Sequence, residues 1–205
     1  MEKEYIIKSL KEMIPNAKCE LNYNSDYTLL IAILLSAQSL DKVVNTITPT
    51  LFEKYPTLND LKNANINDIA QIINPVGLAN NKAKSIKELS TILVDKYASK
   101  VPVDREILTT LPGIGIKTSG VFLVEYYNYN YLPVDTHVKR VSYRLNLIKE
   151  NSSIKQIEET LSIFFDNNNL GKIHQLLVLF GRYICKSKSP KCNICKFNGK
   201  CLLTH

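Results

Sequence analysis

Four cysteines near the end of the chain have a spacing that could bind a metal centre. They follow the pattern Cys185-x6-Cys192-x2-Cys195-x5-Cys201, while the fifth cysteine, Cys19, stands alone and is typical of a partly buried thiol. Clustered thiols in a reducing compartment act as thiolate ligands, and four suit either a tetrahedral zinc ion or a cubic iron–sulfur cluster. Zinc ligands usually come as two close pairs, and only Cys192 and Cys195 form one. The spacing therefore favours an iron–sulfur cluster.

The same segment is strongly basic and holds no acidic residue between 185 and 201. Such a patch can neutralise phosphates, although lysines can also simply keep an exposed loop soluble. We expect phosphate contacts from Lys188 and Lys191. The lysines of the segment are Lys186, Lys188, Lys191, Lys196 and Lys200.

A glycine-rich turn is the second chemical feature. Residues 111–118 read Leu-Pro-Gly-Ile-Gly-Ile-Lys-Thr and lie between two helical stretches. Gly113 and Gly115 would let the backbone turn tightly, and free amides leading into a helix N-terminus can hold a phosphate oxygen. If that phosphate belonged to a DNA strand, the contact would carry no information about base sequence. A plain Pro-Gly connection between helices is the alternative.

The third feature is the segment 134–140, which reads Val-Asp-Thr-His-Val-Lys-Arg. Asp135 stands where a helix is expected to begin, so it is a good N-cap on structural grounds alone. His137 is more often a structural or solvent-facing histidine than a catalyst in such a position.

These features must be positioned by helices. Apolar residues recur with helical spacing, as at Ile66, Ile69, Ile72 and Ile73, and no stretch alternates as a strand does. The sequence predicts an all-α chain of many short helices, with its best visible break near Leu132-Pro133. Besides 5–14 and 66–73, helices are expected over 27–36, 43–54, 57–64, 80–97, 105–111, 117–127, 136–147, 154–165 and 172–183.

Composition narrows the class of protein. The chain has 205 residues, of which 45% are hydrophobic and 22% charged, as in a globular protein. Its net charge of +7 fits a polyanionic partner. The longest apolar run, Leu29 to Leu35, is far shorter than the roughly 20 residues that span a bilayer. The N-terminus lacks a signal-peptide pattern, so we expect a cytoplasmic protein without a membrane partner.

Together, four motifs in this order resemble the endonuclease III family of DNA base-excision repair glycosylases. The resemblance covers residues 21–201, and the cysteine spacing is that of the family's [4Fe-4S] loop. The motifs are Leu34-Leu35-Ser36-Ala37-Gln38, the glycine turn with Lys117, Val134-Asp135-Thr136-His137, and Gly181-Arg182-Tyr183 followed by the cysteines.

The resemblance implies a helix-hairpin-helix fold of two all-α lobes. A six-helix lobe would span 23–132 with the hairpin at about 105–127, and a cluster lobe would combine 1–22 with 133–205, its iron–sulfur loop being 185–201. Lys117 and Asp135 would face each other across the cleft between the lobes. The partner would be double-stranded DNA with damaged bases or abasic sites, bound by a monomer.

The resemblance also implies a mechanism. Lys117 would attack the sugar C1′ of a flipped nucleotide while Asp135 stabilises the developing positive charge, and the Schiff base would allow β-elimination 3′ to the lesion. The enzyme would be a bifunctional glycosylase and abasic-site lyase, with oxidised pyrimidines as the expected lesions. Gln38 would fill the vacated stack and Leu78 would act as a wedge. On their residue types alone, Gln38 would cap a helix and Leu78 would belong to the core.

The chain departs from the family pattern at a few positions. Ile116 replaces an arginine, Ser119-Gly120 replace Ala-Asn, and Ala79 replaces an aromatic residue, so lesion preference and phosphate contacts could differ. One alternative function is a monofunctional adenine-mismatch glycosylase, against which Lys117 and the end of the chain at His205 argue. Others are a non-catalytic helix-hairpin-helix DNA-binding protein and a zinc-binding interaction protein.

Overall fold

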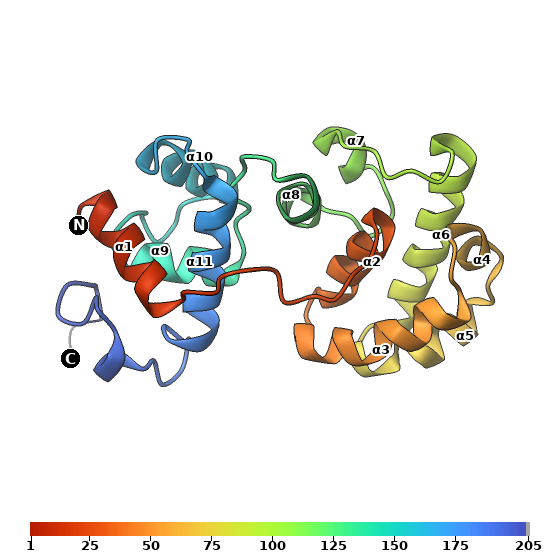
Figure 1. Ribbon diagram of the computed structural model, residues 1–205, viewed down its shortest axis with the longest axis horizontal. Coiled ribbons are helices and arrows are strands. Elements are labelled where there is room, and N and C mark those ends of the chain that lie inside the picture. Colours follow the sequence, from red (N-terminus) through yellow and green to blue (C-terminus); the bar gives the residue numbers. More distant parts are fainter. Residues whose placement is uncertain (204–205) are drawn as a thin grey trace. The chain divides into compact units, whose positions relative to one another are not determined.

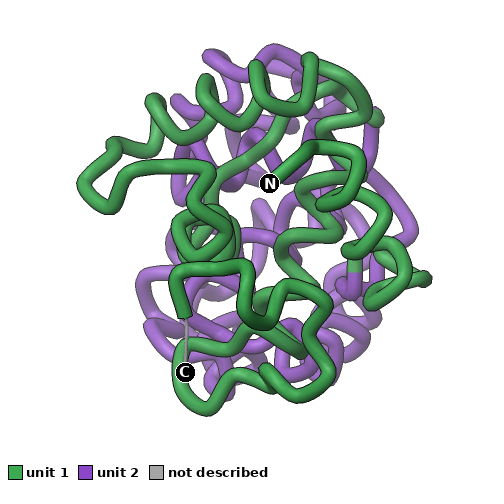
Figure 2. The backbone as a smooth tube through the Cα atoms, turned by 90° about the vertical axis from the view of Figure 1, so that its left-hand side faces the viewer, with its two compact units in different colours: residues 1–19, 128–205 green, residues 20–127 purple. Residues whose placement is uncertain are grey.

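The computed structural model describes residues 1–203, which fold into helices joined by turns and longer loops, with no strand among them (Figure 1). The chain's last residue, His205, lies outside the described residues. The all-α prediction is confirmed. The chain divides into two compact units, residues 20–127 and residues 1–19 with 128–205 (Figure 2). No helix in the described part of the chain is both long and apolar enough to cross a membrane.

The unit 20–127 is built around α2, which spans Asp26–Ser36. Every residue from Thr28 to Leu35 is buried, because α3, α6 and α8 all pack against this helix. A helix enclosed on all sides is apolar all round, which explains why the run 29–35 shows no amphipathic period. The other elements are α3 (Asp41–Lys54), α4 (Leu58–Asn63), α5 (Ile66–Ile72), η1 (Asn74–Val76), α6 (Ala79–Tyr97), α7 (Arg105–Thr109) and α8 (Ile116–Tyr127).

The second unit is built around α11, which spans Leu170–Tyr183 and packs against α1 and α9. Phe180 of this helix is buried against Phe197 of the cysteine segment, with ring centroids 5.6 Å apart. Ile6 and Leu10 of the N-terminal helix α1 belong to the same core as Phe197, so α1 shares a core with the cysteine segment. The remaining elements are α1 (Lys3–Met13), α9 (Thr136–Arg144), α10 (Ile154–Phe164) and η2 (Cys192–Ile194).

Most expected helix boundaries lie within two residues of the observed ones, and two expected helices end early for reasons that the structure shows. The helix expected over 136–147 ends at Arg144, and just beyond it Asn146 adopts a left-handed backbone with φ 59°. The helix expected over 105–111 ends at Thr109, because the chain turns into the glycine segment. Both errors concern the last turn of a helix, where side-chain periodicity carries little information.

Candidate active site

Gly113 shapes the turn between α7 and α8, which forms the expected hairpin. Its φ is +77°, and a Cβ atom there would lie 2.8 Å from Leu34 Cδ1 and 3.0 Å from Ser85 Cβ. Only glycine therefore allows the turn to pack against α2 and α6. A Cβ at Gly115 would meet nothing within 4 Å, so this position faces open space. The turn is thus anchored on one side and accessible on the other.

Lys117 lies in the first turn of α8, and its side chain is exposed. The preceding residue, Ile116, is 62% exposed, so the start of the helix presents an apolar and a basic side chain to the surroundings. Ser119 and Gly120 are buried on the packed side of α8. The departures from the family pattern at 119 and 120 therefore concern packing, whereas the one at 116 concerns the exposed end.

Asp135 is the N-cap of α9. Its Oδ1 accepts a hydrogen bond of 2.7 Å from the backbone N–H of Val138, and the side chain is half-buried. The capping interpretation from sequence is thus correct. The cap uses one of the two carboxylate oxygens, so capping and a further role for the carboxylate are compatible. Lys117 belongs to the unit 20–127 and Asp135 to the other unit.

His137, the second residue of α9, is half-buried and lies among charged side chains. Burial lowers its pKa, and the nearby charges of Arg140 and Arg182 act in the same direction against the opposing charge of Asp135. Arg140 Nη2 lies 3.1 Å from His137 Nδ1, and a guanidinium can only donate, so Nδ1 accepts. These contacts support a structural role for this histidine.

Two residues of α11 position the segment that carries Asp135. A Cβ at Gly181 would lie 3.0 Å from His137 Cβ and 3.1 Å from Val141 Cγ2, so this glycine lets α9 and α11 approach closely. The buried His174 donates from Nδ1 to the carbonyl oxygen of Pro133 over 2.8 Å. The backbone leading to Asp135 is therefore fixed from α11.

Gln38 and Leu78 lie on two exposed turns of the unit 20–127. Leu78 is 58% exposed and does not belong to the core, and the C-cap of α2 is Ala37 rather than Gln38. Both residues adopt a left-handed backbone, with φ 58° at Gln38 and φ 52° at Leu78. This conformation costs about 1–2 kcal/mol for a residue with a side chain. Leu78 borders an open hollow of about 810 Å³ whose rim is rich in side-chain amides.

The four cysteines of the segment 185–201 are all half-buried. Burial raises the pKa of the Cys195 thiol, and the charges of the other three cysteines add to that effect. Arg144 Nη1 donates to Cys185 Sγ over 3.3 Å, and Arg140 Nε donates to the Cys185 carbonyl over 3.1 Å. Within residues 1–203, no group of three or more histidine, cysteine or acidic side chains is arranged to hold a single metal ion.

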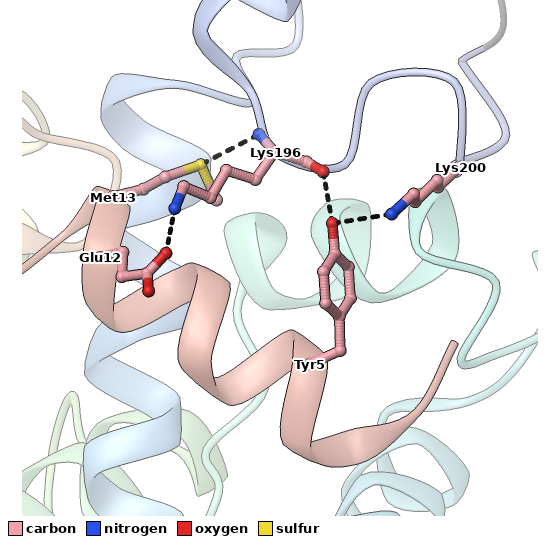
Figure 3. Close-up of polar contacts among 5 residues, drawn as sticks. All are labelled: Tyr5, Glu12, Met13, Lys196 and Lys200. Atoms are coloured by element: carbon pink, nitrogen blue, oxygen red, sulfur yellow. Dashed lines mark hydrogen bonds and ion pairs between the residues drawn. The ribbon is translucent and has the colours of Figure 1, made fainter.

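Helix α1 holds the far end of the cysteine segment (Figure 3). Tyr5 donates its hydroxyl hydrogen to the Lys196 carbonyl over 2.8 Å, and Lys200 Nζ lies 3.1 Å from the same hydroxyl, whose pKa it lowers. Lys196 also forms an ion pair with Glu12. Two of the five lysines are thus used inside the protein. The three that are exposed without a side-chain partner among the described residues are Lys186, Lys188 and Lys191.

Comparison with known proteins identifies the family. The model of the HhH-GPD superfamily of base excision DNA repair proteins matches residues 31–165. Endonuclease III of Bacillus subtilis (strain 168) is 37% identical over 198 residues, which cover 97% of this chain and 90% of that protein. Endonuclease III of Rickettsia felis is 41% identical over 187 residues, covering 91% and 87%. The chain belongs to the endonuclease III family.

Solved structures support this membership. A trapped endonuclease III–DNA covalent intermediate matches with a TM-score of 0.93 and 38% identity, covering 98% of this chain and 96% of that one. A non-covalent endonuclease III–DNA complex also has a TM-score of 0.93, at 39% identity, covering 97% and 93%. A thermostable thymine-DNA glycosylase, 22% identical with a TM-score of 0.84 and covering 97% and 94%, shares the fold.

The endonuclease III motifs do not include two basic residues that organise these segments. Arg144, one helical turn after Arg140, donates to the carbonyls of Lys186 and Ser187. Lys82 is buried in α6 and donates to three backbone carbonyls. A sequence signal exists for Lys82, because it shares the helical stripe of Ile86, Leu89 and Leu93, where an apolar residue is expected.

Proposed function

We propose that this member of the endonuclease III family is a bifunctional enzyme, which removes damaged bases from duplex DNA and cleaves the strand at the resulting abasic site. The observation that carries the proposal is the exposed amine of Lys117, placed directly after the glycine turn. The likeness to an endonuclease III captured as a covalent intermediate with DNA supports it, because such an intermediate requires a nucleophile.

The chemistry begins at the sugar of a flipped nucleotide. The neutral amine of Lys117 attacks C1′, the bond between C1′ and the base breaks, and the base leaves with its bonding electrons and takes up a proton. Asp135 stabilises the positive charge that develops on the sugar, and carries protons. Ring opening gives a Schiff base, which acidifies a C2′ hydrogen. Loss of that proton expels the oxygen on C3′, so the strand is cut 3′ to the lesion.

Gln38 and Leu78 open the duplex in this proposal. Leu78 is an exposed apolar side chain that can enter a base step, and the Gln38 amide can replace the hydrogen bonds of the displaced base. Unstacking a step costs a few kcal/mol, which is least at a damaged pair. The open side of the hairpin at Gly115 admits a DNA strand, whose phosphate the free amides at the start of α8 bind. Oxidised pyrimidines are the proposed lesions.

The four cysteines are the proposed ligands of a [4Fe-4S] cluster. All four donors are sulfur, which suits iron and sulfide, and Arg144 already donates to Cys185 Sγ. When bound, the cluster would cross-link the loop through four iron–sulfur bonds. Lys188 and Lys191 would then contact DNA phosphates from a fixed backbone.

We infer that the enzyme works as a monomer, because one chain carries both the lysine and the aspartate that the reaction needs. Its place of action is the compartment that contains the DNA, which in a bacterium is the cytoplasm with its nucleoid.

Borohydride trapping on a duplex with an abasic site tests the function. The wild-type chain should form a covalent adduct with DNA and Lys117→Ala should form none, while Lys84→Ala, which changes an exposed lysine of α6, should react like the wild type. An adduct of undiminished yield with Lys117→Ala refutes the assignment. Release of adenine from a mismatch without strand cleavage would instead identify a monofunctional adenine-mismatch glycosylase.

A further inference from the structure

Lys82 connects the two turns that carry Gln38 and Leu78. It lies in the first turn of α6, and its Nζ donates hydrogen bonds of 2.9 Å to the Leu35 carbonyl, 2.8 Å to the Ala37 carbonyl and 3.0 Å to the Val76 carbonyl. Ala37 directly precedes Gln38, and Val76 is separated from Leu78 by one residue. One ammonium group therefore fixes the backbone beside both residues that are proposed to enter DNA.

The contacts of Lys82 use all of its hydrogen-bonding capacity. An ammonium group has three N–H donors, and each has a carbonyl partner. The residue is only 7% exposed, and this burial lowers the pKa of its ammonium group. Among residues 1–203, no carboxylate pairs with it. A buried charge without a counter-ion is a costly choice for packing alone, since a methionine would fill similar space. The residue therefore needs an explanation beyond the stability of the core.

The backbone that Lys82 holds is strained. Gln38 and Leu78 both have a positive φ, as does Gly77 at +67°, and such conformations persist in residues with side chains only when the surroundings impose them. Ser39 adds to the restraint, because its hydroxyl donates to the same Val76 carbonyl. The two turns are thus joined to each other through one carbonyl and one ammonium.

We propose that Lys82 is a positioning residue for DNA opening, which holds the Gln38 and Leu78 turns as one preorganised pair. The inference rests on the proposed function and extends it. In this role Lys82 acts through the two turns that it holds and not through contact with DNA or the reacting sugar. Its loss should slow the removal of a stacked, paired base more than cleavage at an abasic site, because an abasic sugar has no base to extract.

The test uses Lys82→Met and Ser39→Ala in the full chain, with Lys84→Met as the matched control on the same helix. Lys84 is exposed and its Nζ lies 3.8 Å from Glu88 Oε1. Single-turnover rate constants are measured for base excision from a duplex with an oxidised pyrimidine and for strand cleavage at a preformed abasic site. Borohydride trapping counts the active fraction of each preparation.

Lys82→Met should lower the excision rate constant by about tenfold or more, and the cleavage rate constant by less than about threefold, with an unchanged active fraction. Ser39→Ala should lower the ratio of the excision rate constant to the cleavage rate constant by a smaller factor. Lys84→Met should leave this ratio unchanged. In a Gln38→Ala/Leu78→Ala background, Lys82→Met should change the excision rate constant by less than about twofold, because nothing remains for it to position.

Equal losses of both rate constants, or a loss that follows the active fraction, would overturn the role of Lys82. If Lys82→Met does not fold, Ser39→Ala decides, and an unchanged ratio in that variant overturns the proposal. A wild-type chain that gives no trapped adduct refutes the proposed function, whereas an active wild type with an unaffected ratio in the variants refutes only this inference.

Discussion

Replacing Gly113 should mainly lower the stability of the protein, whereas replacing Gly115 should mainly weaken its binding to DNA. At Gly113 an added Cβ meets Leu34 Cδ1 at 2.8 Å and Ser85 Cβ at 3.0 Å, and the φ of +77° is unfavourable for any L side chain. At Gly115 the same atom meets nothing within 4 Å, and the position has no positive φ. The two changes add the same methyl group two residues apart.

The expected loss for Gly113→Ala combines two contributions. A left-handed backbone costs an alanine about 1–2 kcal/mol. Overpacking a fitted contact costs about 1–3 kcal/mol, and relief is limited because Leu34 is buried and Ser85 Cβ is bonded directly to the backbone. A loss of about 3 kcal/mol in the free energy of unfolding lowers Tm by about 6–12 °C in a chain of this size.

Gly115→Ala should lower the free energy of unfolding by no more than about 1 kcal/mol. The added methyl group meets no neighbour, and the loss comes only from the lower preference of alanine for the position immediately before a helix. The Ser119 N–H bonds to the Gly115 carbonyl, which places this residue at the start of α8. The methyl group would instead occupy the space through which a DNA strand is proposed to approach. Duplex binding by Gly115→Ala should therefore weaken out of proportion to its stability.

Urea denaturation followed by circular dichroism gives the two free energies, and fluorescence anisotropy with a labelled abasic-site duplex gives the affinities. Both measurements use protein with equal iron content, so that the loop 185–201 is in the same state. Equal stability losses in the two variants would refute the packing argument for Gly113. Unchanged DNA affinity in Gly115→Ala would refute the proposed approach of the strand.

Further predictions concern the second unit. Asp135→Asn keeps a good N-cap but removes the charge, so it should retain duplex binding while the excision rate constant falls by about 100-fold or more; unchanged excision would remove Asp135 from the mechanism. Replacing Lys188 and Lys191 by glutamine should reduce the salt dependence of log K by about 1.8, and an unaltered slope would show that they only aid solubility. Metal analysis of purified protein should find iron with acid-labile sulfide, and zinc in their place would exclude the cluster. Tyr5→Phe keeps the contact of the Tyr5 ring with Phe197 but loses the hydroxyl bonds, so it should cost about 0.5–1.5 kcal/mol in urea unfolding, and a loss as large as that of Tyr5→Ala would contradict this.

Local patterns predict most of the helices because their signals are short-range. The apolar run of α2 and the spaced isoleucines of α5 indicate helices through residues that lie within two turns of each other. The residue type of Asp135 indicates the start of α9. The helix ends are predicted less well. Asn146 takes a left-handed conformation just beyond α9, and this choice depends on the turn that follows rather than on periodicity.

The detailed geometry of the candidate site depends on contacts between distant segments. Glycines at 113 and 115 look alike in the sequence, yet only Gly113 packs against α2 and α6. Lys82 and Leu35 are 47 positions apart, and no local pattern announces their hydrogen bond. The exposure of Leu78 is likewise set by the turn that Val76 and Gly77 form. Family resemblance selects Gly113, Gly115 and Leu78 but not Lys82, and only the fold explains how these residues are held.

The second unit is made of two separate segments of the chain, and this determines when the unit can fold during synthesis. It combines residues 1–19 with 128–205, whereas the other unit is one continuous stretch, 20–127. Ribosomes add about 5–20 residues per second, so α1 emerges first and waits roughly 10–40 s until Phe197, with which Tyr5 of α1 packs, has been made. The segment with Gln38, Leu78 and Lys117 can fold during that delay. In a nascent chain, the unit that carries Lys117 would thus be folded before the cysteine segment 185–201 is synthesised and can pack with α1.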